Sequence, residues 1–495
     1  MASAIASSHP THTVWHQGYS RIARPLTILP TFEGNLTFKK RAFGRAEERI
    51  LAHFRGSRME AYFLTTNHEY FHAEVLRRIE RDPHFMRWVT SEVRRIMRNL
   101  LAFTERLERQ DLATLPDEKL IGLLQQFHRR YAEIFGYGLI NTYDQDLVAA
   151  IKDYCDTRWP SRTATRYFTL LTSDTRDTIY EREKRDLLRA TEAFGKAKSP
   201  AARARIVHRL VEQYGWLYIN YEGRARSGND FEKTLRSLRR NWKTPKQRIA
   251  AMRRKKEKLR SEQRSLERRL HIDAGHRRLI RAIRQNAYLR EWRKPQSVRS
   301  VYIERKLLDE LAHRIGVSTN ELKFLFPREI VRALKTKRFD RGMLRARMTN
   351  AVYDLRKGSY RVHTGQRGRA LLQKIAQRQQ NEGESVHGLC AFPGSVTGRV
   401  RCIRTLADLT RFRKGEIFVG KVTSPDLIPV FDRARAVVTD EGGLTSHAAI
   451  VSREMHVPCV VGAKRATALF RDGDTVEVDA QHGIVRRVRV VHKRP

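Results

Sequence analysis

The chain has 495 residues, 40% of them hydrophobic, which is enough for two or three domains that each bury a core of their own. No apolar run approaches the roughly 18 residues that a membrane-spanning helix needs, and residues 1–13 lack the basic and apolar regions of a secretory signal. We therefore expect a soluble cytoplasmic protein with no membrane partner.

The formal net charge of +44 would attract polyanions such as nucleic acid, nucleotides or acidic proteins. The same charge could be a solvated surface without a dedicated partner, and the sequence contains no recognised nucleic-acid-binding module. Both interpretations stay open. The four cysteines, at positions 155, 390, 402 and 459, are far apart and lack paired metal-ligand spacing, which argues against a disulfide framework or a zinc site.

Residues 1–14 are predicted to be a disordered tail, and residues 15–376 a large, mainly α-helical region. Within it, Phe71, Val75 and Ile79 follow helical spacing, as do Leu120 and Leu124. Further on, Gly316 is a predicted helix C-cap, Ser318 and Glu321 have capping-box spacing, and Pro327 suits the first turn of another helix.

A basic helical arm is predicted over residues 245–271, in an antiparallel hairpin. One face repeats at alternating spacings of three and four residues: Ile249, Met252, Lys256, Leu259, Gln263, Leu266 and Leu270. Lys256 and Gln263 interrupt this otherwise apolar seam, and Arg and Lys dominate the other faces. The arm could lie along RNA or DNA, or it could be a solvated helix face with interspersed glutamates.

A second patch of the helical region combines aromatic and basic residues. Its members are Tyr214, Trp216, Tyr218, Tyr221, Arg224 and Arg226. Aromatic walls beside guanidinium groups could hold a small hydroxylated or phosphorylated compound, or the aromatic side chains could pack a core.

A polar linker is predicted over residues 377–386, and the composition changes after it. Short β-rich runs then appear at 398–403, 416–419, 436–438, 457–461, 475–478 and 484–490. Turn signals such as Pro393-Gly394 and Asp472-Gly473-Asp474 separate them. Residues 387–491 are therefore expected to form a compact module of strands and helices, and the fold class is α+β with several domains.

The most informative segment of this module begins Gly442-Gly443-Leu444-Thr445-Ser446-His447. The two glycines permit a tight loop, and His447 stands where a helix is predicted to begin. Amide groups and the helix dipole at such an N-terminus stabilise an anion, and they also keep the imidazole neutral and nucleophilic. These residue types suit a histidine that carries a phosphoryl group.

The module resembles the swivelling phosphohistidine domain of the phosphoenolpyruvate-utilising enzymes, which include phosphoenolpyruvate synthase, pyruvate phosphate dikinase and rifampin phosphotransferase. The resemblance rests on Pro393-Gly394-Ser395, on 415–419 followed by Thr423-Ser424-Pro425-Asp426, on the histidine segment and on 457–462. It implies that His447 is the phosphorylated residue, that Gly442 and Gly443 form the phosphate loop and that Thr423 lies close to it.

Two further residues, Thr445 and Ser446, are expected to cap the helix and donate hydrogen bonds to phosphoryl oxygens. Arg453 is equally compatible with a surface position and a catalytic one, whereas His456 suits a structural role. Asp440 and Glu441 are interpreted as loop residues, because a carboxylate beside a phosphoryl group would repel it.

The resemblance is incomplete, because neither an ATP-grasp domain nor a phosphoenolpyruvate-binding barrel is recognised in the sequence. It implies a phosphotransfer protein that binds no cofactor by itself, with ATP and Mg²⁺ on a separate ATP-grasp-type partner and a small molecule as the acceptor. Movement of the domain would require residues 377–384 to be flexible. The alternative is a non-catalytic basic binding or regulatory protein that contacts nucleic acid or a protein partner.

Overall fold

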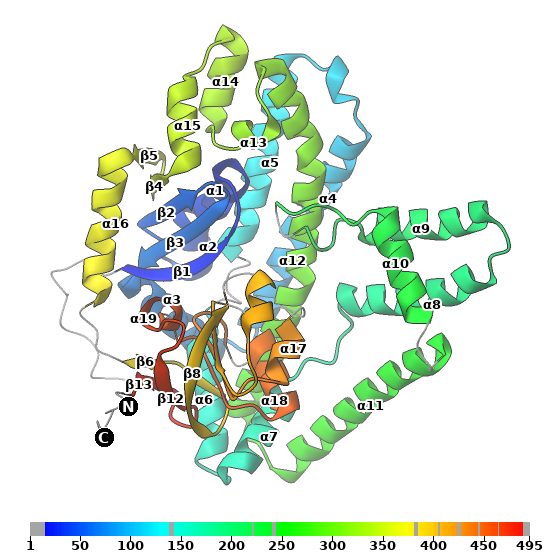
Figure 1. The fold of residues 1–495 in the computed structure, drawn as a ribbon, viewed down its shortest axis with the longest axis vertical. Helices are drawn as coiled ribbons and strands as arrows, with labels where there is room; N and C mark the ends of the chain where they lie inside the picture. Colours follow the sequence, from blue (N-terminus) through cyan, green and yellow to red (C-terminus); the bar gives the residue numbers. More distant parts are fainter. Residues whose placement is uncertain are drawn as a thin grey trace, which may run out of the picture. The chain divides into compact units, whose positions relative to one another are not determined.

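The computed structural model describes residues 15–137, 143–219, 222–239, 244–380, 385–403, 406–421, 423, 427–443, 446–463 and 465–488 (Figure 1). It forms two compact units: Met1–Leu147 with Leu170–Leu372, and Val148–Thr169 with Gln373–Pro495. We call them the N-terminal unit and the C-terminal unit. The predicted tail over residues 1–14 lies outside the described residues.

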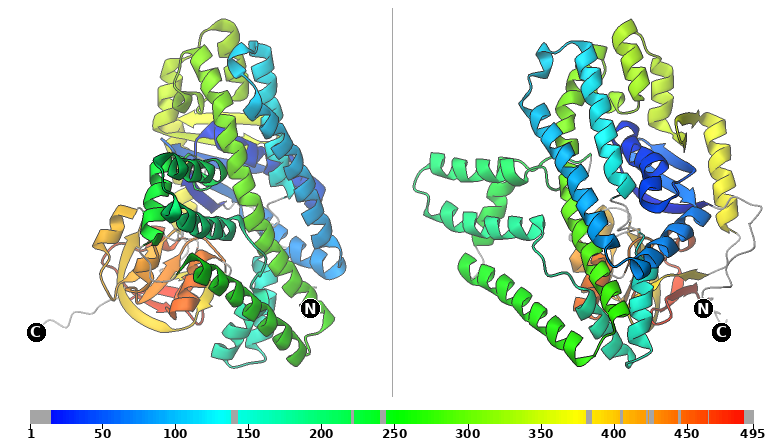
Figure 2. Two further views of the ribbon diagram at one scale, coloured as in Figure 1. Left: turned by 90° about the vertical axis from the view of Figure 1, so that its right-hand side faces the viewer. Right: turned by 180° about the vertical axis from the view of Figure 1, so that it is seen from behind.

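Helices dominate the N-terminal unit, as the sequence predicts. Most of α6 and α7 and the end of α16 belong to the C-terminal unit. In chain order the helices up to α16 are α1 (Pro25–Glu33), the π-helix η1 (Gly34–Phe38), α2 (Lys39–Phe43), α3 (Thr65–Arg81), α4 (Phe85–Arg109), η2 (Leu112–Thr114), α5 (Asp117–Tyr137), α6 (Gln145–Asp156), α7 (Ser161–Thr172), α8 (Ile179–Lys196), α9 (Pro200–Tyr214), α10 (Gly228–Arg239), α11 (Pro245–Arg269), α12 (Ala274–Ile315), α13 (Thr319–Leu322), α14 (Pro327–Thr336), α15 (Arg341–Thr349) and α16 (Gly365–Gln380). Helices α4, α5 and α12 lie side by side and form the largest helical layer (Figure 2).

The predicted helix caps near the end of α12 are confirmed. Gly316 ends α12 in the left-handed conformation, with φ +76°, which a residue with a side chain rarely adopts. Ser318 and Glu321 then form a capping box at α13, and Pro327 stands in the first turn of α14.

A five-stranded antiparallel sheet also lies in the N-terminal unit, and the sequence analysis did not predict it. Its strands are β1 (Trp15–Ile22), β2 (Arg49–Arg55), β3 (Arg58–Leu64), β4 (Ala351–Arg356) and β5 (Ser359–Thr364), in the order β1-β3-β2-β4-β5. Arg, His and Glu within β2 and β3 interrupt the apolar runs by which a strand is recognised in a sequence. Phe54 and Tyr353 nevertheless pack edge to face in a buried core on this sheet, with ring centroids 5.0 Å apart.

A buried ion pair also lies in the N-terminal unit. The Lys39 and Glu47 side chains are 0% and 1% exposed, with Nζ and Oε1 2.8 Å apart. Lys39 also donates to the Tyr143 hydroxyl at 2.5 Å, and Asn67 Nδ2 donates to Glu47 Oε2 at 3.2 Å. Burial lowers the pKa of Lys39 to about 8, while the charge of Glu47 opposes that shift. These four residues are called the Lys39 cluster below.

The aromatic patch near residue 218 is partly packed, and Tyr218 itself is 51% exposed. Tyr214 and Trp216 are buried, and the Tyr218 hydroxyl donates to Glu183 at 2.6 Å. Arg226 donates to the same carboxylate at 2.8 Å. Burial supports the core-packing alternative for Tyr214 and Trp216, while Tyr218 and Arg226 are held by Glu183. Tyr221 lies outside the described residues.

The C-terminal unit contains an eight-stranded mixed sheet, ordered β6-β13-β12-β8-β9-β10-β11-β7. The strands are β6 (Ser385–His387), β7 (Leu389–Phe392), β8 (Ser395–Ile403), β9 (Ile417–Gly420), β10 (Ala436–Thr439), β11 (Cys459–Val461), β12 (Thr475–Asp479) and β13 (Ile484–Arg487). All six predicted runs fall on strands, and β6 and β7 are additional. Valines such as Val400, Val419 and Val438 fill the core.

Strands β8, β9, β10 and β11 are parallel neighbours, while the outer pairs are antiparallel. The connections carry η4 (Leu406–Arg411), α17 (Ile428–Phe431), α18 (His447–Met455) and α19 (Ala466–Leu469).

The predicted linker overlaps the end of α16 and the start of β6, and residues 381–384 between them lie outside the described residues. Among the described helices, none is long and apolar enough to cross a bilayer.

Candidate functional site

The loop before His447 lies at the carboxyl edge of the parallel strands of the C-terminal unit. Strands β9 and β10 pair in parallel, with Gly420 opposite Thr439, so the segments that follow them leave the sheet at the same edge. The Asp440 amide donates to the Gly420 carbonyl at 3.0 Å and the Glu441 amide to the Lys421 carbonyl at 2.9 Å. In open sheets with parallel strands, ligand sites form at this edge.

The loop itself depends on Gly442. This residue has φ +109°, and a Cβ placed there would lie 3.0 Å from Ser446 Cβ and Oγ. The turn closes when the Ser446 amide donates to the Gly443 carbonyl at 2.9 Å. A side chain at position 442 would therefore meet both an unfavourable backbone conformation and the residue that begins the helix.

Helix α18 begins at His447, as the sequence predicts. Ser446 is its N-cap, with extended φ and ψ, and Ser446 Oγ accepts a hydrogen bond from the Ala449 amide at 3.4 Å. Ala448 and Ala449 are buried, which holds this end of the helix against the sheet. The imidazole of His447 therefore stands at the positive end of the helix dipole.

The His447 ring is only partly buried, and a hydroxyl holds it. Thr423 Oγ1 lies 3.0 Å from His447 Nδ1, in the segment that follows β9. If Nδ1 carries the proton and donates it to Thr423, Nε2 carries the lone pair of the ring. The hydrogen bond thus orients the ring, and in that tautomer it leaves Nε2 without a proton.

Asp440 is close to His447 in the sequence, but its carboxylate forms hydrogen bonds with α19 and not with α18. It accepts a hydrogen bond from the Thr467 amide at 3.0 Å and another from the Thr467 hydroxyl. Burial raises the pKa of the Asp440 carboxyl, and these hydrogen bonds oppose that shift. Asp440 therefore anchors α19 beside the loop, a role that the sequence analysis did not assign because residue 467 follows two elements later.

Arg453 is not a surface residue, because its guanidinium ties α18 to α7. Its Nε donates to the Ala449 carbonyl at 2.8 Å, and Nη1 donates to Thr169 Oγ1 on α7 at 3.0 Å. Burial lowers the pKa of the Arg453 guanidinium to about 10. His456 ends α18 with φ +57°, and its ring packs edge-on against Phe392, which suits the structural role expected of it.

The structure thus brings together five of the six predicted site residues: His447, Ser446, Thr423, Gly442 and Gly443. Thr445 lies outside the described residues. Within the described ranges, no three His, Cys, Asp or Glu side chains are grouped so that they could hold a metal ion.

Comparison with known proteins agrees with this geometry. Residues 412–483 match the model of the PEP-utilising enzyme mobile domain. Over 106 residues the chain is 48% identical to a probable phosphoenolpyruvate synthase from Archaeoglobus fulgidus, covering 21% of this chain and 14% of the relative. Over 109 residues it is 38% identical to the uncharacterised phosphotransferase YvkC of Bacillus subtilis, covering 22% of this chain and 13% of the relative.

Among solved structures, aconitase X from Thermococcus kodakaraensis matches with a TM-score of 0.18 and 16% identity, over 22% of this chain and 100% of that chain. That likeness is too low to carry an argument. The chain spans about one seventh of the length of the curated relatives above. The resemblance predicted from the sequence is confirmed: the segment around His447 matches the mobile domain of PEP-utilising enzymes.

Proposed function

We propose that this protein transfers phosphoryl groups, with His447 as the residue that carries them. A separate ATP-grasp-type protein would supply the phosphoryl group, and a small molecule would accept it. The observation that carries the proposal is the ring of His447, held by Thr423 at the N-terminus of α18 in a mobile domain of the PEP-utilising type.

Each transfer exchanges one bond to phosphorus for another. In the first, the Nε2 lone pair of His447 forms a P–N bond while the P–O bond to the nucleotide breaks, and the nucleotide leaves with that electron pair. In the second, an acceptor oxygen forms a P–O bond while the P–N bond breaks. The imidazole recovers its lone pair and the proton of the acceptor hydroxyl passes to water.

The chain's own residues position the group and stabilise its charge. Thr423 orients the ring, and the N-terminus of α18 faces the phosphoryl oxygens with its positive dipole end. Mg²⁺ and ATP would bind on the donor protein, where the metal ion would neutralise phosphate charge. This division agrees with a loop whose nearby carboxylate, Asp440, is engaged by Thr467.

The test is phosphorylation by a donor in cell extract. The purified protein is incubated with extract and with ATP labelled at the β or the γ position, and acid-labile label on the protein is measured. We expect label on the wild type and on His456→Ala, which removes an exposed histidine from the other end of the same helix, and none on His447→Ala.

Equal labelling of His447→Ala and the wild type would contradict the proposal. If no condition labels the protein, the non-catalytic alternative is the better account. Loss of label from the wild type when a small-molecule fraction is added would identify the pool that contains the acceptor.

A further inference from the structure

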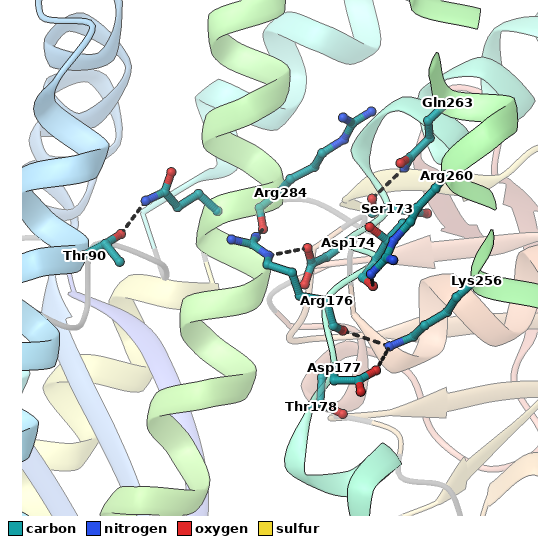
Figure 3. Close-up of polar contacts among 12 residues, drawn as sticks. Thr90, Ser173, Asp174, Arg176, Asp177, Thr178, Lys256, Arg260, Gln263 and Arg284 are labelled. Atoms are coloured by element: carbon teal, nitrogen blue, oxygen red, sulfur yellow. Dashed lines mark hydrogen bonds and ion pairs between the residues drawn. The ribbon is translucent and has the colours of Figure 1, made fainter. Parts of the chain in front are cut away.

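The inner side of α11 is fixed to the N-terminal unit by the two residues that interrupt its apolar seam. Lys256 Nζ donates to the Arg176 carbonyl at 3.0 Å and to Asp177 Oδ1 at 2.6 Å (Figure 3). Gln263 Nε2 donates to the carbonyls of Leu170 and Ser173, each at 2.8 Å. These polar side chains therefore anchor the helix to the end of α7 and the segment before α8.

The outer side of α11 is strongly basic. In this fully described helix the exposed basic residues of this side are Lys246, Arg253, Arg254, Lys255, Lys258, Arg264, Arg268 and Arg269, whereas Arg260 turns inward and donates to the Thr175 carbonyl at 2.9 Å. The exposed acidic residues are Glu257 and Glu262, which pair within the helix with Arg253 and Lys258. Glu267 pairs with Arg284 of α12 at 2.8 Å. The glutamates are thus engaged, and a large positive excess remains.

Like charges also repeat along this outer side at one-turn spacing. Arg254 and Lys258 are four residues apart, and so are Arg264 and Arg268. Like-charged pairs at this spacing destabilise a helix. A helix that served only as a solvated strut would gain from alternating charges, so this arrangement indicates an anionic partner that offsets the repulsion.

Two features restrict the chemistry of that partner. The helix contains no aromatic residue, so it cannot stack the bases of a single strand. Its apolar residues face the unit: Leu266 is buried and Leu259 is half-buried, so no apolar face remains to enter a lipid surface. A helix of 25 residues is about 37 Å long, close to one turn of B-form DNA.

We propose that the outer side of α11 binds the phosphate backbone of double-stranded nucleic acid without reading its bases. The guanidinium and ammonium groups would contact phosphates and release counterions, while Lys256 and Gln263 hold the helix in place from the other side. This binding is independent of His447 and goes beyond the phosphotransfer proposed above.

The test measures binding of the full chain to a fluorescent DNA duplex over a range of salt concentrations. The outer variant is Arg254→Gln, Lys258→Gln, Arg264→Gln and Arg268→Gln combined. The control variant removes the same charge from exposed positions of α4 and α5: Arg98→Gln, Arg106→Gln, Arg109→Gln and Arg129→Gln. Thermal melting checks that both remain folded.

We expect the outer variant to bind at least tenfold more weakly at 0.1 M salt. We also expect its slope of log affinity against log salt to fall by about 0.9 for each phosphate that the variant no longer neutralises. The control variant, the His447→Ala variant and the charge-conserving Arg254→Lys, Arg264→Lys, Arg268→Lys variant should bind within about threefold of the wild type.

Three outcomes would overturn the proposal. The first is equal weakening of the outer and control variants, which would mean that net charge alone is responsible. The second is tighter binding to a single strand of the same length than to the duplex. The third is binding to poly-glutamate without binding to the duplex, which would assign the outer side of α11 to an acidic protein.

Discussion

The His447 loop and the Lys39 cluster differ in how far their central polar group is exposed to solvent. The His447 ring is partly exposed at the start of α18, and a neutral hydroxyl orients it without removing its reactivity. The Lys39 ammonium is sealed, and Glu47, Tyr143 and the face of the Phe71 ring surround it. Below, the His447 loop is called the open site and the Lys39 cluster the closed site. The difference agrees with the phosphotransfer proposed for the open site and with a stabilising role for the closed site in the N-terminal unit.

The largest expected effect is the loss of stability when one member of the closed site is removed. Lys39→Met leaves the buried Glu47 carboxylate without its counter-charge, and breaking such a pair costs about 3–5 kcal/mol. Chemical denaturation of the full chain, followed by a probe in the N-terminal unit, measures the change. The double variant Lys39→Met/Glu47→Met should lose much less than the sum of the two single variants.

The open site should behave differently in the same measurement. His447→Ala should lower the free energy of unfolding by about 1.5 kcal/mol at most, because the ring is partly exposed and the variant loses its hydrogen bond with Thr423. A His447→Ala variant as unstable as Lys39→Met would remove the distinction between the two sites.

A second prediction concerns the pH dependence of the closed site. Burial lowers the folded-state pKa of Lys39 to about 8 from 10.5. Between these two pH values the unfolded chain retains a proton that the folded protein has released, so this group makes the folded state more stable as the pH rises. The full gain is about 3 kcal/mol. Denaturation at several pH values should show this rise in the wild type and not in Lys39→Met; equal profiles would contradict it.

Next comes the hydroxyl at the open site. Thr423→Val keeps the size of the side chain and removes its hydrogen bond to His447 Nδ1, so the ring loses its preferred orientation. One such bond is worth about 1.5 kcal/mol, which corresponds to roughly tenfold slower labelling. Thr423→Ser should restore the rate. Unchanged labelling of Thr423→Val would show that the hydroxyl does not position the ring.

The smallest expected effect is local. Ser446→Ala removes the cap that accepts from the Ala449 amide, at a cost of about 1 kcal/mol. Faster hydrogen exchange of the first amides of α18 should report it, and Ser446→Asn should exchange like the wild type. Equal protection in Ser446→Ala would mean that the cap contributes nothing to this helix end.

The open site could be predicted from the sequence because its information is local. Two glycines, the Ser446 cap and His447 are adjacent, and the short valine-rich strands around them follow one another along the chain. Loop and helix start were therefore visible without knowledge of long-range contacts. Thr423 was accessible only through the family resemblance.

The N-terminal sheet and the Lys39 cluster could not be predicted in this way, because topology alone brings their parts together. Strand β2 pairs with β4, with His53 opposite Val352, almost 300 residues away. Lys39 meets Tyr143 across 104 positions. In α11 the pattern was visible, but Lys256 and Gln263 looked like defects until their partners at residues 170–177 were known.

The most direct test of the central claim is the chemical state of His447 itself. The protein is phosphorylated in extract, digested at neutral or alkaline pH and analysed by mass spectrometry. We predict one phosphoryl group on the peptide that contains His447, located on the imidazole and removed by mild acid. Phosphate found only on other residues, or none under any condition, would contradict the account.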